Sequence, residues 1–420
     1  MKLLAIRERT VPISAPMRNA SVSFDQMTAS ALAIVSDRVI DGAPVVGYAF
    51  DSIGRYGKGG LLRDRFIPRL LSADPDALLD SDGLIDPDAC VAELMRNEKD
   101  GGHGERPGAV GLIDAALWDL RAKLERRPLW RVLADRDAIG RDSTARLPIT
   151  ERRGGPSAAD ASVRSGQASL AADGTFALYG SCGHFRPGRG QAELAGLAAE
   201  VRSARDSGFN LIKIKLGGAS VADDQARTEA AMGAAGPARI AVDVNGRLAA
   251  DIESQWFERI GALGVAWIEE PAPALDYQRL ARQSDMTPVA LATGENLFSF
   301  DDARNLLRYG GLRSQRDRIQ VDVSLSYGVG EYRRILDEFA AAGWDRSAFL
   351  PHAGHLFAAQ VVAGLKLGMH ESASDLSLAF GGLWDDVPIA DGRARAGDHP
   401  GVGFEAKAKL FECLRPLGEC

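Results

Sequence analysis

The sequence predicts an α/β fold in which a barrel of parallel strands and helices follows a smaller α+β domain. From about residue 209 onward, short β-branched runs start 30, 25, 24, 29 and 29 residues apart, with helical patterns between them. Strands that alternate with helices at this spacing are typical of βα units with parallel strands. The first 140 residues instead show alternating apolar and polar runs followed by helical stretches, which is the order of an α+β domain.

The N-terminal region, residues 1–140, is expected to begin with a small antiparallel sheet. Its alternating runs are Lys2–Ile13, Thr28–Ser36 and Val45–Asp51. They are joined through Asp41-Gly42, a dipeptide that favours a tight hairpin turn. Helical stretches follow at Asp86–Asn97 and Gly108–Arg126. The first of them opens with Asp86-Pro87, a suitable N-cap followed by proline at the first helical position.

The barrel is expected over residues 175–380. Its strand candidates are Thr175–Tyr179, Asn210–Leu216, Ile240–Val244, Val265–Glu269, Val289–Ala292, Arg318–Val323 and Ser347–Leu350. A helix from His355 to Leu367 and a short run after His370 would close the barrel. An open doubly wound sheet would need a glycine-rich phosphate-binding loop after its first strand, and the sequence has none. Residues 141–174, rich in Ala, Ser, Gly, Arg and Asp, are expected to form a surface loop or linker.

The composition is that of a globular protein and argues against several functional classes. The chain has 420 residues, with 50 Lys and Arg against 57 Asp and Glu, and a net charge of −7. This acidic balance argues against a nucleic-acid partner, and no apolar stretch approaches the roughly 18 residues of a membrane span. The four cysteines lack CxxC spacing and the N-terminal segment lacks the apolar stretch of a signal peptide, so a reduced cytoplasmic location is expected.

Three acidic residues, Asp243, Glu269 and Glu295, lie at or just past strand ends and are spaced 26 residues apart. Catalytic groups of a β/α barrel sit at the carboxyl ends of its strands, so these three side chains are expected to meet. Converging carboxylates stay ionised together only if a cation holds them. Oxygen-only ligands with room for a substrate favour Mg²⁺. Taken singly, each acid would more readily cap a helix or form a surface ion pair.

Lys213 and Lys215 lie two residues apart on one strand, so their side chains point the same way. Two adjacent ammonium groups are expected to lower the pKa of at least one of them, and a lysine closer to neutrality can act as a general base. The alternative is a pair of solvated edge lysines. The leucines and isoleucines of the same strand mark it as buried, where free lysines would be costly, so the sequence favours a catalytic role.

Asp322 and His352 end neighbouring strands and are expected to form a carboxylate–imidazole pair. The carboxylate would orient the ring and keep its proton on the outer nitrogen. Taken alone, His352 would be a structural or exposed histidine. With the lysines across the mouth of the barrel, a matched base and acid is favoured.

The strand-end residues stand in motifs that resemble those of the enolase superfamily, mandelate racemase subgroup. The matching motifs are KIK, VDVNG, WIEEP, ATGEN, QVD and FLPH, and the likeness covers nearly the whole chain. It implies a capping α+β domain over a modified (β/α)7β barrel of the TIM type. A C-terminal segment, residues 381–420, is expected to pack back on the capping domain.

The same resemblance implies roles for the site residues. Asp243, Glu269 and Glu295 would bind Mg²⁺. Lys215 would remove the proton alpha to a carboxylate, and the enediolate that forms would be stabilised by Mg²⁺. His352, backed by Asp322, would face the other side of the substrate.

Within this subgroup, longer tracts resemble those of the D-tartrate dehydratases. They are Ser23–Asp25, Gly47–Arg55, Gly101–Gly104, His370–Gly382 and Gly401–Glu405. This likeness implies elimination of water from tartrate to give oxaloacetate, in which a base removes the α-proton and an acid protonates the departing β-hydroxyl. It also implies that Glu371 is a further active-site acid, beside Lys213 and Lys215.

The residues expected to contact the substrate are Arg18, Asp51, His103, His184 and Asn245. Arg18 and His103 of the capping domain would bind a distal carboxylate or hydroxyl, and a solvated loop arginine is the alternative for Arg18. Asp51 stands where the family has Asn, and an anion there would repel a dicarboxylate unless Arg55 or Arg18 pairs with it. His184 lies in a first-strand tract that differs from the family pattern.

Three functions remain open from the sequence. The favoured one is a Mg²⁺-dependent dehydratase of a small hydroxy acid, tartrate or a close relative. A racemase or epimerase could use Lys215 and His352 as opposed bases. A barrel that only binds a metal and a ligand is a third possibility, although it would not need two lysines in a buried strand. Since the superfamily commonly forms oligomers, a homo-oligomer is expected.

Overall fold

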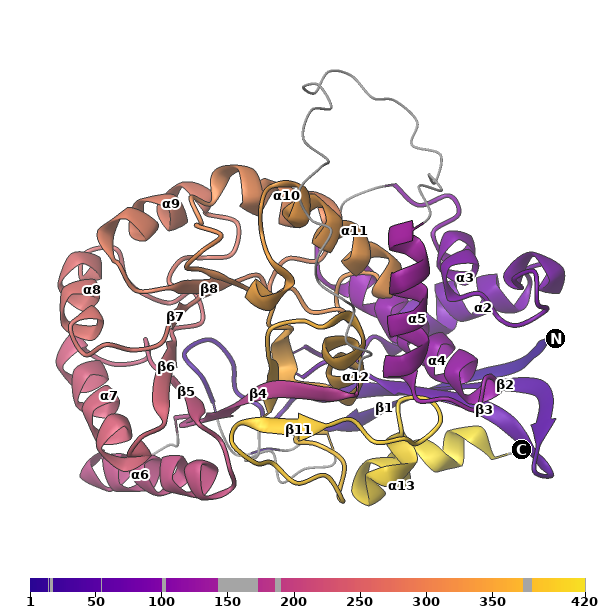
Figure 1. Ribbon diagram of the computed structural model, residues 1–420, viewed down its shortest axis with the longest axis horizontal. Coiled ribbons are helices and arrows are strands. Elements are labelled where there is room, and N and C mark those ends of the chain that lie inside the picture. Colours follow the sequence, from indigo (N-terminus) through magenta and orange to yellow (C-terminus); the bar gives the residue numbers. More distant parts are fainter. Residues whose placement is uncertain are drawn as a thin grey trace.

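The computed structural model describes residues 1–13, 15, 18–53, 55–99, 103–142, 173–185, 190–372 and 380–419. A ring of parallel strands surrounded by helices makes up one part of the molecule, and an antiparallel sheet with its own helices lies beside it (Figure 1). The predicted fold class, an α/β barrel with an α+β capping domain, is confirmed. Nearly all of the expected loop at 141–174 lies outside the described residues.

The capping domain begins with a three-stranded antiparallel sheet of β1 (Leu3–Pro12), β2 (Thr28–Ile40) and β3 (Ala43–Phe50). Asp41 and Gly42 connect β2 to β3 and have φ angles of 52° and 83°. Positive φ at both central residues is what a type I′ hairpin turn requires. The Asp-Gly pair therefore explains where the chain reverses.

The helices of the capping domain are α1 (Gly59–Leu61), α2 (Ile67–Leu71), α3 (Pro87–Leu94), α4 (Glu105–Leu124) and α5 (Leu129–Asp142). The two predicted helices correspond to α3 and α4, and the Asp86 carboxylate caps α3 by accepting the Asp88 N–H at 3.0 Å. α4 packs so closely on β3 that a Cβ at Gly47 would lie 2.2 Å from the Ala116 carbonyl oxygen. α5 was not predicted, because its polar sequence merges with the Arg- and Asp-rich segment that follows.

The barrel alternates strands and helices as the sequence predicted. Its strands are β4 (Thr175–Cys182), β5 (Leu211–Lys215), β6 (Arg239–Asp243), β7 (Ile268–Glu269), β8 (Leu291–Thr293), β9 (Arg318–Ile319) and β10 (His370–Ser372). Its helices are α6 (Gly190–Asp206), α7 (Val221–Ala235), α8 (Glu253–Gly261), α9 (Tyr277–Met286), α10 (Phe300–Tyr309), α11 (Val329–Ala341) and α12 (Leu356–Leu365). Neighbouring strands pair in the order β10-β4-β5-β6-β7-β8-β9.

The predicted strand at Ser347–Leu350 is reduced to a single pairing. Phe349 forms a parallel bridge with Ile319, and its carbonyl accepts the N–H of Gly368 at 2.9 Å. These contacts close the ring between β9 and β10. The residues before them form a 3-10 turn, because the Asp345 carboxylate accepts the Ser347 N–H at 2.8 Å and caps that turn.

The bottom of the barrel interior holds an apolar layer of side chains from successive strands. The layer consists of Tyr179, Leu211, Ala241, Trp267, Ala292 and Leu350. On β5, Leu211 belongs to this layer, whereas Ile212 and Ile214 join the larger core beneath the helices. Because side chains alternate along a strand, Lys213 and Lys215 point into the barrel above Leu211. The bottom of the barrel is thus apolar and its mouth is charged.

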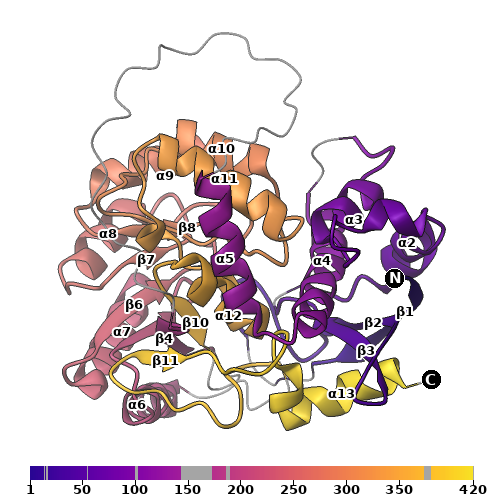
Figure 2. The same cartoon turned by 45° about the vertical axis from the view of Figure 1, so that its right-hand side comes forward.

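The capping domain and barrel are joined through several contacts. α5 lies beside α12, where the Trp130 N–H donates to Gln360 Oε1 at 2.8 Å (Figure 2).

The C-terminal helix α13 (Ala408–Gly418) lies beside the capping sheet (Figures 1 and 2). Arg7 and Arg9 of β1 donate to carbonyls at Leu417 and Cys413 of α13, at 2.8 and 2.9 Å. β11 (Arg393–Arg395) pairs antiparallel with β4.

No helix in the described part of the chain is long and apolar enough to span a bilayer. Cys90 and Cys182 are buried, whereas Cys413 is partly exposed.

Candidate active site

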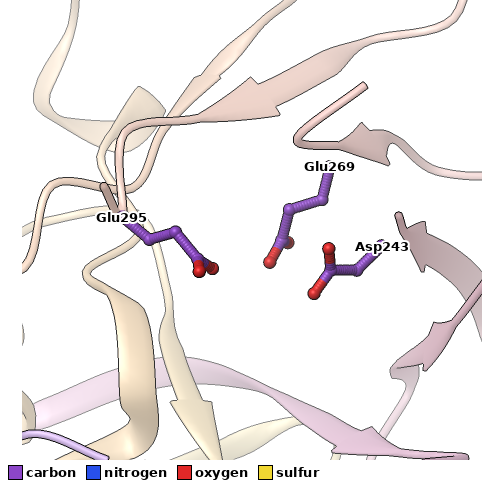
Figure 3. A group of neighbouring side chains, drawn as sticks. All are labelled: Asp243, Glu269 and Glu295. Atoms are coloured by element: carbon purple, nitrogen blue, oxygen red, sulfur yellow. The ribbon is translucent and has the colours of Figure 1, made fainter. Parts of the chain in front are cut away.

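The three predicted metal ligands meet at the mouth of the barrel. Asp243 ends β6, Glu269 ends β7, and Glu295 follows β8. One ligand oxygen of each residue lies within 4.8 Å of those of the other two, and all three residues are buried. Figure 3 shows the three carboxylates turned toward a common point. This convergence follows from the 26-residue spacing, which places the acids on neighbouring strands.

The charge of this cluster favours a bound cation. Burial raises the pKa of Glu269 to about 7, with Asp243 adding to the rise and Lys213 opposing it. Burial and the Glu295 carboxylate also raise the pKa of Glu270 well above its ordinary range. Carboxylates crowded in a buried site resist ionisation unless a positive charge is close. An all-oxygen donor set of this kind fits a hard divalent cation such as Mg²⁺.

Lys213 links the carboxylates of several strands. Its ammonium group contacts Glu269, lies 2.9 Å from Glu371 Oε1 and lies 3.9 Å from Asp243 Oδ2. Its side chain is fully buried. Burial lowers the pKa of Lys213, but the Glu269 and Glu371 carboxylates more than offset this and raise the pKa well above its ordinary value. The Glu269 and Glu371 carboxylates thus favour the charged form of Lys213, which lies behind the predicted metal ligands.

Lys215 lies closer to the open part of the site, with its Nζ 2.5 Å from Asp243 Oδ2. Burial and Lys213 lower the pKa of Lys215, as the sequence suggested. The Asp243 carboxylate outweighs both, so the pKa of Lys215 is raised and the predicted lowering is wrong for this arrangement. A cation on Asp243 would compete for the same oxygen and would reduce this effect.

His352 lies at the other end of the acid cluster. Its Nδ1 is 3.3 Å from Asp322 Oδ2, and its Nε2 is 3.5 Å from Glu295 Oε2. The Ser52 hydroxyl of the capping domain donates to the same Asp322 oxygen. Burial lowers the pKa of His352, but Glu295 and Asp322 offset this and raise it. The predicted Asp322–His352 pair is therefore present, and a capping-domain residue holds it.

A cavity of about 290 Å³ opens between the barrel mouth and the capping domain. Lys215 and His352 both line it, at the Asp243 and Glu295 ends of the ligand cluster. Glu371 also lines it, accepts the Ala353 N–H at 3.2 Å, and has a lowered pKa despite burial because Lys213 lies beside it. A small acid bound here would contact a lysine, a histidine and the metal ligands together.

Two of the five predicted substrate contacts line the cavity. Asn245 has a φ of 47°, and its Nδ2 donates to Asp243 Oδ2 at 3.0 Å. His184 is buried with its Nδ1 unpartnered among the described residues, and burial lowers its pKa to about 3. Both therefore present neutral polar groups to a ligand.

The other three predicted contacts are not among the residues that line the cavity. Arg18 is exposed and its guanidinium lies over the Phe185 ring, 5.9 Å from the centroid. His103 is exposed and packs edge-on against Phe298. Asp51 is buried in the capping domain, where its Oδ1 lies 2.9 Å from Lys58 Nζ. Asp51 is thus neutralised by a lysine, and not by either of the arginines considered from the sequence.

The structure adds lining residues that sequence reasoning did not assign to substrate binding. They include Asn19, Ser21, Arg55, Ser181, Arg247, Glu270 and Asn296. Glu270 and Asn296 directly follow predicted ligands, so their position was a usable signal. Arg55 donates to the Asn296 carboxamide, whose Nδ2 donates to Glu270 Oε1 at 2.6 Å. These contacts join the capping domain to the ligand-bearing strand ends.

Fold and site together define a β/α-barrel protein with a three-carboxylate metal site beneath a capping domain. A family model described as Enolase C-terminal domain-like matches residues 196–410, more than half of the chain. The chain belongs to this family, within the enolase superfamily. The resemblance seen in the sequence motifs is thereby confirmed at the level of the superfamily.

Curated relatives include several sugar-acid dehydratases. L-talarate/galactarate dehydratase of Salmonella typhimurium is 25% identical over 407 residues, covering 94% of this chain and 86% of the relative. Arabinonate dehydratase of Saccharolobus solfataricus is 23% identical, covering 74% of this chain and 73% of the relative. Among solved structures, a racemase from Streptomyces coelicolor with bound magnesium covers 99% of both chains with a TM-score of 0.71 and 21% identity. That likeness shows the fold.

Proposed function

We propose that this protein is a Mg²⁺-dependent hydro-lyase that dehydrates a hydroxy acid or acid sugar. The observation that carries the proposal is the cavity in which Lys215 and His352 stand at opposite ends of the Asp243–Glu269–Glu295 cluster. Mg²⁺ held by the three carboxylates would stabilise the negative charge that develops on the substrate carboxylate as its α-proton leaves. The dehydratases among the curated relatives support this class of reaction.

Lys215 is assigned as the base that removes the α-proton through Nζ. Its position beside Asp243 places the amine next to the metal ligands, where the carboxylate of the substrate would bind. Lys213 lies deeper and is fully buried among Glu269, Glu371 and Asp243, so it cannot exchange protons with a ligand as readily. The two lysines of the KIK motif therefore have different roles.

His352 is assigned as the acid that protonates the departing β-hydroxyl. Its raised pKa keeps the imidazole protonated nearer to neutral pH, and Asp322 orients the ring through Nδ1. Nε2 is then the nitrogen that carries the transferable proton toward the cavity. Glu371, held by Lys213 and the Ala353 N–H, would bind a substrate hydroxyl. We keep tartrate, converted to oxaloacetate, as the particular substrate proposed from the sequence motifs.

Deuterium exchange and product formation together test the proposal. The wild-type protein with Mg²⁺ should convert tartrate or another acid sugar to a keto acid, and Lys215→Ala should lose both keto-acid formation and α-proton exchange in D₂O. A general base typically contributes about 10²- to 10⁴-fold to the rate. Lys213→Ala is the matched variant, and it should retain measurable exchange. Exchange that persists in Lys215→Ala would refute the assignment of the base.

A racemase or epimerase is the second candidate. The same two residues at opposite ends of the ligand cluster would deliver and remove a proton on opposite faces of one carbon. A solved racemase also shares the fold. Deuterium incorporation into recovered substrate, without any keto acid, would select this reaction. Ligand binding without exchange or product on any acid sugar would indicate a protein that only binds its ligand.

A further inference from the structure

Arg247 lies in the loop after β6, three residues after Val244 and two after Asn245 in the sequence. It is one of the residues that line the cavity. Its Nε donates to the Ser21 hydroxyl at 2.8 Å, and that hydroxyl donates to the Asn245 carbonyl at 2.9 Å. Ser21 belongs to the capping domain, so these two bonds hold the arginine at the junction of cap and barrel. The guanidinium is therefore positioned, although its residue is exposed.

The charge of Arg247 has no partner in the described part of the chain. No carboxylate of a described residue lies within 4.0 Å of its guanidinium, and Ser21 is its one hydrogen-bond partner there. Arg55, the other arginine that lines the cavity, donates hydrogen bonds to Asn296 Oδ1 and, at 3.4 Å, to the Glu295 carbonyl. Arg247 thus presents two terminal nitrogens to a ligand, whereas Arg55 braces the strand ends.

The cap side of the cavity suits an anion. The described capping-domain residues that line it are Asn19, Ser21, Val22, Phe24, Ile53 and Arg55, and none of them is acidic. The acidic lining residues, Glu270, Glu295 and Glu371, all come from the barrel. A substrate whose first carboxylate lies at the metal ligands would turn its far end toward Arg247 and Ser21. Planar guanidinium groups bind carboxylates through paired hydrogen bonds.

We propose that Arg247 binds the carboxylate at the far end of the substrate, so that this site selects dicarboxylates over monocarboxylates. The inference rests on the proposed function, because it takes the metal ligands as the site of the first carboxylate. From the sequence, the far end of the substrate was expected to lie near Arg18, Asp51 and His103. The proposal assigns its binding to Arg247 instead, because Arg247 lines the cavity and those three residues do not. A volume of about 290 Å³ is sufficient for a small diacid.

Binding of matched acid pairs tests this assignment. Tartrate and threonate share one carbon chain, as do galactarate and galactonate, and each pair differs only in a distal carboxylate or hydroxymethyl group. Dissociation constants are measured by calorimetry with Mg²⁺ for the wild type, Arg247→Gln and Arg247→Lys. The Gln variant should weaken binding of a recognised diacid by about 10- to 100-fold, the usual cost of a lost charged hydrogen bond. Its binding of the monoacid should change by less than about twofold, and Arg247→Lys should restore part of the selectivity.

Arg259→Gln is the matched control, because Arg259 is an exposed arginine on α8 whose guanidinium has one polar contact among the described residues, to Gln225 Oε1 at 3.3 Å. It removes the same charge without altering the cavity lining. Equal weakening of diacid and monoacid in Arg247→Gln, or no change for either, would overturn the proposal. So would preference of the wild type for the monoacids.

The same measurements separate this inference from the proposed reaction. If diacids bind in an Arg247-dependent way but no keto acid or proton exchange appears, dehydration fails and the binding role of Arg247 stands. If keto acid forms with monoacids and diacids alike in both proteins, the reaction stands and the role of Arg247 fails. If no acid of either pair binds to the wild type with Mg²⁺, both are refuted.

Discussion

Replacing Lys58 with Met would leave the Asp51 carboxylate buried without its countercharge. The two side chains are each 1% exposed, and Lys58 Nζ lies 2.9 Å from Asp51 Oδ1. The other oxygen of Asp51 accepts the Ser30 N–H at 2.7 Å. Burial raises the pKa of Asp51 and Lys58 opposes this rise, so the lysine favours the ionised carboxylate.

The magnitude follows from this geometry. Two unit charges 2.9 Å apart attract by about 6 kcal/mol at an effective dielectric constant near 20. Desolvation of both charges cancels much of this attraction in the intact pair. Removing one partner leaves the desolvated charge of the other, which typically costs about 3–5 kcal/mol. Lys58→Met and Asp51→Asn should each lower the free energy of unfolding by that amount, and the double variant should lose less than the sum of the two.

Urea unfolding of the wild type, both single variants and the double variant gives this coupling energy. Kinetics on tartrate and a monoacid sugar should be measured on the same proteins. Because Asp51 lies outside the cavity lining, Asp51→Asn should leave the ratio of kcat/KM values for the two acids unchanged. A changed ratio with unchanged stability would refute this reasoning and return Asp51 to the substrate, as the sequence alone suggested.

Three further predictions concern the metal, the acid and the pH. EDTA should abolish turnover, and Glu269→Gln should weaken Mg²⁺ binding in calorimetry by at least about 10-fold; full activity of metal-stripped protein would contradict this. Ser52→Ala should lower kcat about 10- to 100-fold with little change in KM, because Asp322 would orient His352 less well, and Ser52→Thr should retain most of the rate. Burial lowers the pKa of His355 in the folded protein to about 4, whereas a histidine in the unfolded chain has a pKa of about 6.5. As the pH falls below about 6.5, the unfolded chain therefore takes up a proton on this residue before the folded protein does. The contribution of His355 to the free energy of unfolding should be complete above that pH and should decrease by about 3 kcal/mol as the pH falls to about 4. Denaturant unfolding at several pH values measures this change.

The sequence by itself determined the barrel and its ligand cluster. The spacing of 26 residues places Asp243, Glu269 and Glu295 on neighbouring strands, and alternation along β5 turns Lys213 and Lys215 into the barrel. Both arguments are local: a βα unit has a typical length, and a strand repeats every two residues. The same locality explains why the Asp41-Gly42 turn was predicted correctly.

The tertiary structure alone decided the direction of the capping-domain side chains and the balance of charge at the mouth. Asp51 turns to Lys58, Ser52 turns to Asp322, and Ser21 holds Arg247, although nothing in the spacing of these residues indicates such partners. Ser52 and Asp322 are 270 positions apart in the chain. The direction of the pKa shift of Lys215 depends likewise on whether the Asp243 carboxylate or the Lys213 ammonium group has the larger effect. The distances between side chains on neighbouring strands decide this. Contacts between residues far apart in sequence arise from packing, which no local pattern encodes.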